Sequence, residues 1–169
     1  MTNKEGTSTG SPIARYIAEN PRGTVLVLSD YRTLNRAHAE FLWSHGYSVI
    51  TAITCSDAVR IVGSESGKVE IDAVVIASKV HGWHHREAEE PPEEIPEDSD
   101  SWQLDNIKHV FDLVKRRQRQ CPLLFVAQDL IKTGWYQITI AGLEELGLVC
   151  RTYKASDPHT LINGLNQRG

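Results

Sequence analysis

Three histidines stand close together in one short stretch of the chain, His81, His84 and His85, and Glu87 follows them. Imidazole and carboxylate groups suit Zn²⁺ or Ni²⁺. No second cluster of such residues in the sequence completes a ligand set, and neighbouring histidines often bind metal ions adventitiously. The histidines are therefore weak metal candidates, and we expect an exposed loop here.

Other chemistry would depend on the stretch from Ile71 to Gly82, in which an unbroken apolar run is flanked by Asp72 and Lys79. Such a run is typical of a central parallel strand covered on both faces. Ligands and reacting groups in open α/β sheets gather just beyond the carboxyl ends of these strands, where Ala77 and Ser78 stand. Alanine has no nucleophilic group, and Ser78 points to the opposite face from Ala77.

The chain alternates strand-like and helix-like segments. Strands are expected at 24–28, 47–53, 71–76, 122–127 and 147–153, and helices at about 31–45, 56–66, 101–119, 130–146 and from 157. In the first helix the spacing of Leu34, Ala37, His38, Phe41 and Leu42 indicates one apolar face, with Gly46 as the stop. Five such repeats predict an α/β fold: a doubly wound, five-stranded parallel sheet of order 2-1-3-4-5 in three αβα layers.

The N-terminal part differs from the rest. Residues 1–10 are polar and are expected to be disordered. Ser11-Pro12 is typical of a helix start, and Asn20-Pro21 of its end. We expect residues 1–22 to form a tail with a short helix and residues 23–169 to form the domain.

Charge is unevenly distributed along the 169 residues, whose net charge is −4. Eight of the 22 acidic residues lie from Glu87 to Asp100, and this stretch contains no Lys or Arg. The acidic stretch marks a loop insertion at about 83–100. The loop is either a solvated segment or an electrostatic gate that competes for a basic partner or folds onto Lys115, Arg116, Arg117 and Arg119. No motif supports direct contact with nucleic acid.

Composition and motifs exclude several classes of protein. No apolar run approaches the roughly 20 residues of a membrane span, and no signal-peptide pattern opens the chain, so we expect a cytoplasmic protein without membrane contact. Cys55, Cys121 and Cys150 are far apart and are expected to be reduced, buried thiols. The phosphate-binding glycine loops and the nucleophile elbow are missing, so we expect no enzyme.

The ordered set of segments resembles the receiver domain of bacterial two-component response regulators. The resemblance covers about residues 23–167 apart from the acidic loop, and it rests on four matches: residues 25–30, 72–77, 122–127 and 147–158. It implies a flavodoxin-like (CheY-like) fold and a place in two-component signal transduction or a phosphorelay.

The resemblance also implies a phosphorylation pocket, and here that pocket is degenerate. At the position of the family's acidic pair this chain has Ser29-Asp30. Ala77 stands in place of the acceptor aspartate, and Ala127 stands in place of the strand-end hydroxyl residue. The family's lysine is kept as Lys154. One carboxylate is too few for Mg²⁺, and alanine cannot accept a phosphoryl group. We therefore expect no cofactor, with Mg²⁺ binding disfavoured. Asp30 and Lys154 would form either a pair that fixes the last loop or a weak surface ion pair.

Two further sets of residues follow from the resemblance. The aromatic switch position, three residues before the lysine, holds Arg151, with Tyr153 nearby. Trp135 and Tyr136 are near the fourth helix, on the family's usual partner face. They are partner hot spots if exposed and core residues if buried.

These observations predict a pseudo-receiver, a signalling module that acts through protein–protein contacts without aspartyl phosphorylation. Its partner would be a kinase, an effector or a second receiver. A second copy of this chain would give a homodimer. The alternative is a sensor that binds a small anion or metabolite in the vacated pocket, with Lys79 or Lys154 holding the charge. A conventional receiver that uses Asp30 or Ser78 ranks last.

Overall fold

The computed structural model describes residues 3–5, 14–29, 32–53, 57–58, 60–61, 70–77, 110–116, 122–128, 145 and 150–166. Several predictions fall outside these residues. They concern the acidic loop at 83–100, the histidine cluster (His81, His84, His85), Trp135 and Tyr136, Asp30, Ser78 and Lys79.

Five strands form the parallel part of the sheet. They are β3 (Thr24–Leu28), β4 (Ser48–Ala52), β5 (Ala73–Ile76), β6 (Leu123–Ala127) and β7 (Cys150–Tyr153). Their spatial order is β4-β3-β5-β6-β7, and every neighbouring pair is parallel. The predicted order 2-1-3-4-5 is confirmed.

Two more strands extend the sheet beyond β4, and the sequence did not predict them. β2 (Ala14–Ile17) pairs antiparallel with β4, and β1 (Asn3–Glu5) pairs antiparallel with β2. The predicted short helix is therefore wrong over 14–17, and the predicted disorder is wrong over 3–5. Burial follows a strand period, since Tyr16 and Ala18 are buried while Ile17 between them is exposed. Pairing with the edge of β4 outweighs the local helix-start signal.

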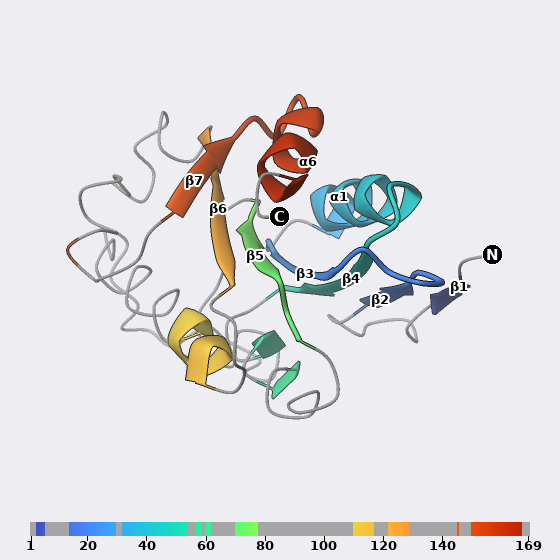
Figure 1. Ribbon diagram of the computed structural model, residues 1–169, viewed down its shortest axis with the longest axis horizontal. Helices are drawn as coiled ribbons and strands as arrows, with labels where there is room; N and C mark the ends of the chain where they lie inside the picture. Colours follow the sequence, from blue (N-terminus) through green and yellow to red (C-terminus); the bar gives the residue numbers. More distant parts are fainter. Residues whose placement is uncertain are drawn as a thin grey trace, which may run out of the picture.

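The helices lie on both faces of the sheet, as predicted. Figure 1 shows α1 (Arg32–Ser44) and α6 (His159–Asn166) on one side, and the helical residues 110–116 (yellow) with 57–58 and 60–61 on the other. This is the three-layer αβα arrangement. The carboxyl ends of β3, β5 and β6 therefore reach one edge of a sheet that is covered on both sides.

The buried face of α1 differs from the predicted one. Its buried residues are Asn35, His38, Ala39 and Leu42, whereas Ala37 is exposed. Both sets follow the i, i+3, i+4, i+7 spacing of a helix face, and the observed buried face is turned by one residue from the predicted one. A polar residue, Asn35, and a titratable one, His38, are thereby turned towards the sheet. The predicted stop at Gly46 is confirmed, with a φ of 93° that favours glycine.

Asp72 links the central strands by hydrogen bonds at their amino-terminal ends. Its Oδ2 accepts the backbone N–H of Thr24 at 2.8 Å, and its own N–H donates to the carbonyl of Thr24 at 2.8 Å. Its carbonyl accepts the N–H of Leu123 at 2.9 Å. The one charged residue in the apolar run therefore fixes β5 against both of its neighbours.

We predict that Gly164→Ala destabilises the fold by about 1–2 kcal/mol. A Cβ at this position would lie 2.5 Å from Cε1 of Phe125, whose ring is buried and cannot move away. Overpacking of this kind costs about 1–3 kcal/mol, which exceeds the gain of about 1 kcal/mol in helix propensity. Urea denaturation measures the difference. Asn163→Ala, at an exposed neighbour on α6, is the control and should change stability by less than about 0.5 kcal/mol. Equal stability of the two variants would contradict the prediction.

Candidate functional site

The candidate site lies where β3, β5 and β6 end. Ser29 follows β3 and donates its N–H to the carbonyl of Ala52 at 3.2 Å. Ala77 follows β5 and donates its N–H to the carbonyl of Leu28 at 2.9 Å. The hydrogen bonds between neighbouring strands thus continue one residue beyond β3 and β5, and they fix the backbone of Ser29 and Ala77.

Two alanines occupy this edge of the sheet. Ala77 is 4% exposed, and Ala127, the last residue of β6, is 0% exposed. A methyl group offers neither a nucleophile nor an oxygen ligand. Neither of these two positions therefore offers a side chain that could accept a phosphoryl group or bind a metal ion.

Asn35 ties α1 to the ends of two strands. Its Nδ2 donates to the carbonyl of Ser29 at 2.9 Å and to that of Ala52 at 3.3 Å. Its Oδ1 is buried and has no hydrogen-bond partner among the described residues. The sequence analysis missed this residue. A polar side chain one position after Leu34 in an amphipathic helix was the only available signal.

Lys154 is exposed and follows β7 directly. Its backbone is fixed, because its N–H donates to Oγ1 of Thr160 at 2.8 Å and its carbonyl accepts the N–H of Asp157 at 2.9 Å. A tight turn thus joins β7 to α6. Asp30 lies outside the described residues, so its pairing with Lys154 and a ligand pocket between them both stay predictions.

The two residues of the predicted switch position differ sharply. Arg151 is exposed, and its Nη1 donates to the carbonyl of Gly164 on α6 at 3.0 Å. Tyr153 is 1% exposed, and its hydroxyl lies 2.8 Å from Nε2 of His38 on α1. The aromatic ring at the end of β7 is therefore packed inside the protein.

His38 links this tyrosine to α1. Its Nδ1 lies 3.0 Å from the carbonyl of Leu34, which can only accept, so Nδ1 carries the proton. Nε2 therefore accepts the hydroxyl proton of Tyr153. The rings meet edge to face, with centroids 5.6 Å apart. Burial lowers the pKa of His38 below its ordinary value of 6.5, although the Leu34 carbonyl acts in the opposite direction.

The described residues contain no group of three or more His, Cys, Asp or Glu side chains placed to hold a metal ion. Within the same residues, no helix is long and apolar enough to cross a bilayer.

The sheet order and the two helical layers define a doubly wound α/β protein with a flavodoxin-like fold. Structural comparison finds chemotaxis protein CheY4 of Vibrio cholerae, with a TM-score of 0.50 and 16% identity over 86% of this chain and 97% of that one. A response regulator receiver domain from Clostridium thermocellum gives a TM-score of 0.48, also at 16% identity, over 86% and 95% of the two chains.

The chain has a receiver-like fold, which the likeness to CheY4 supports. At this identity the likeness concerns the fold alone. No protein-family model and no curated protein sequence matches the chain. The function therefore has to be inferred from the residues of the site.

We predict that Tyr153→Phe lowers the free energy of unfolding by about 1–2 kcal/mol, because it leaves the buried Nε2 of His38 without its donor. Chemical denaturation measures the loss. Tyr47→Phe is the matched control, since its hydroxyl makes a longer 3.3 Å bond to Oδ1 of Asn166 in a half-buried place. The control should lose less than about 0.5 kcal/mol. Equal losses in the two variants would show that the His38–Tyr153 hydrogen bond stabilises the fold no more than the hydrogen bond of Tyr47 does.

We predict that stability falls as the pH drops through the ordinary His range. The folded chain holds His38 neutral, whereas the unfolded chain takes up a proton near pH 6.5. Unfolding therefore consumes a proton below about pH 6.5, and the free energy of unfolding declines by up to about 1.4 kcal/mol per pH unit. The decline ends below the lowered pKa of folded His38.

Denaturation curves between about pH 7.5 and pH 5 test this prediction. His38→Gln should flatten the slope, whereas Asn163→Gln, at an exposed position without a titratable side chain, should leave it unchanged. An unchanged slope in His38→Gln would contradict the assignment.

Proposed function

We propose that this chain is a bacterial, cytoplasmic pseudo-receiver, a signalling module that acts by binding other proteins and does not use aspartyl phosphorylation. It would catalyse no reaction and need no Mg²⁺. Its partner would be a signalling kinase, an effector or a second receiver.

The observation that carries this proposal is the pair of buried alanines at the strand ends. By the resemblance, Ala77 stands at the acceptor position and Ala127 at the hydroxyl position. Both are nearly inaccessible, and the backbone of Ala77 is bonded to Leu28. An alanine methyl packs against apolar neighbours without the desolvation cost that a buried carboxylate would carry. The site thus supports a stable sheet edge in place of a reactive one.

The Tyr153–His38 contact supports a single arrangement of the region after β7. The hydroxyl, the imidazole and the carbonyl of Leu34 satisfy one another in the interior. Moving the tyrosine outwards would leave a buried nitrogen without a partner. A module held in this way would present the same surface to its partner at all times.

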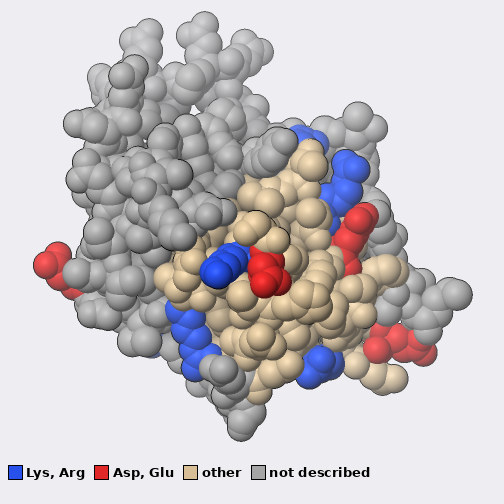
Figure 2. Space-filling view, turned by 90° about the horizontal axis from the view of Figure 1, so that it is seen from above, with Lys and Arg blue, Asp and Glu red and all other residues tan. Residues whose placement is uncertain are grey.

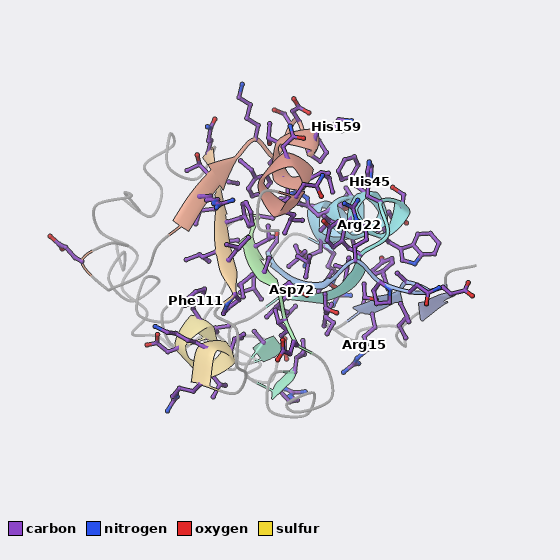
Figure 3. The ribbon with its side chains drawn as sticks, in the orientation of Figure 1. Arg15, Arg22, His45, Asp72, Phe111 and His159 are labelled. Atoms are coloured by element: carbon purple, nitrogen blue, oxygen red, sulfur yellow. The ribbon has the colours of Figure 1, made fainter. Side chains whose placement is uncertain are left out.

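The face made by α1 and α6 is suited to a protein partner. Figure 2 shows this face from above, and its described part is mainly uncharged. α6 has no Lys, Arg, Asp or Glu in its sequence. Three rings cluster between the two helices: Phe41 lies with its centroid 4.4 Å from that of His45 and 5.2 Å from that of His159. Figure 3 shows His45 and His159 near each other at this junction.

We predict that the chain gains no phosphoryl group when it is incubated with Mg²⁺ and acetyl phosphate. The reason is the missing nucleophile at the end of β5. Intact-mass spectrometry measures the result, and a receiver with an intact acceptor aspartate serves as the positive control.

An added phosphoryl group that hydroxylamine removes would overturn the proposal, because it would reveal an aspartyl acceptor. A group that resists hydroxylamine would indicate a serine ester and would favour the third reading, in which Ser78 takes part.

A further inference from the structure

A cavity of about 350 Å³ lies beside the accessory strand β2, and the proposed function makes no use of it. Its size is within the range of small-molecule sites. Its walls include Arg15, Ile17, Pro21, Thr24, Ser48 and Ile50.

Strand pairing explains why these residues meet. Arg15 is the register partner of Ile50, and Thr24 is that of Ser48. Register partners stand on the same face of a sheet, and Ile17 shares the face of Arg15 because it is two residues further along β2. Three strands thus contribute to one wall. The two strands of a five-stranded receiver could not build this wall without β2.

The opposite face of β2 is already occupied by α1. Nε1 of Trp43 on α1 donates to the carbonyl of Ile17 at 3.2 Å. Figure 3 shows Arg15 pointing away from α1, on the other side of the sheet. Ile17 is 47% exposed and is the one large hydrophobic residue so exposed in the described part of the chain.

The walls combine apolar side chains with one cationic side chain. Ile17, Ile50 and Pro21 are apolar. Oγ of Ser48 already accepts the N–H of Ala18 at 3.0 Å, and the N–H of Thr24 is bonded to Asp72. Arg15 is the only Lys, Arg, Asp or Glu among the described lining residues. A guanidinium has five N–H donors, so it can engage a carboxylate in a bidentate way alongside other contacts.

We propose that this cavity binds a small amphipathic carboxylate, with its aliphatic or aromatic body against Ile17 and Ile50 and its carboxylate on Arg15. The site lies at the amino-terminal ends of β3 and β4, since Thr24 and Ser48 are their first residues. It is at the opposite end of the strands from the Ala77 site. The inference therefore goes beyond the proposed function and does not depend on it.

Isothermal titration of the full chain with octanoate, below its micelle concentration, tests the proposal. We expect saturable binding of one octanoate per chain. Arg15→Gln should weaken it about tenfold or more, because a charge-assisted pair is lost. Arg36→Gln, an exposed arginine on α1 on the other side of the sheet, is the matched control and should bind like the wild type. Octanol, which lacks the charge, should bind about tenfold more weakly than octanoate.

Ile17→Asp provides a second variant that places a negative charge at the exposed mouth without touching the core. It should also weaken octanoate binding. If circular dichroism shows that Arg15→Gln is unfolded, the affinity of Ile17→Asp tests the proposal in its place. Absence of saturable binding, or equal affinity in the wild type and in the folded charge variants, would overturn the proposal.

Discussion

The register of the central parallel strands is the constraint on which the rest of the structure depends. Asp72 fixes it at one end by bonding to both backbone groups of Thr24, and Ala77 continues it at the other by bonding to Leu28. A slip of one residue would turn every buried side chain of β5 to the opposite face. Because the register is fixed, the residues that follow β3, β5 and β6 are brought to a single edge of the sheet, and their chemical types decide what that edge can do.

The sheet itself was readable from the sequence because its strands are short, wholly apolar runs between helical patterns. Val25–Leu28 and Ala73–Ile76 have the length and composition of buried strands, and their alternation with helical patterns predicted a parallel sheet with right-handed crossovers. The same reasoning located Ala77 and Ala127 at the ends of their strands. β2 was misread because Tyr16 and Ile17 suit either a helix or a strand over so short a span. The deciding interaction, pairing with β4, lies far away in sequence.

The side-chain contacts that specify the site in detail could not be predicted from the sequence. His38 and Tyr153 are 115 residues apart, and nothing in either neighbourhood indicates the other. Asn35 is one residue from a predicted apolar position, and a small rotation of α1 decides whether its amide meets solvent or the carbonyls of Ser29 and Ala52. Periodicity predicts that a helix has a buried face, but packing against the sheet selects which residues share it.

The buried hydrogen bond between Tyr153 and His38 favours one position of the aromatic ring at the end of β7. A buried polar group left without its partner costs about 1–3 kcal/mol, so an arrangement that separates the Tyr153 hydroxyl from Nε2 of His38 is disfavoured about 5- to 150-fold. Lys154 follows the tyrosine directly, and its backbone is tied by Thr160 to the start of α6. The backbone that follows Tyr153 is therefore fixed to the start of α6, a helix without charged side chains. Neither Ala77 nor Ala127 has a side chain that changes charge, so these two positions do not alter this preference. A partner that binds this face meets a surface already organised by the interior of the protein.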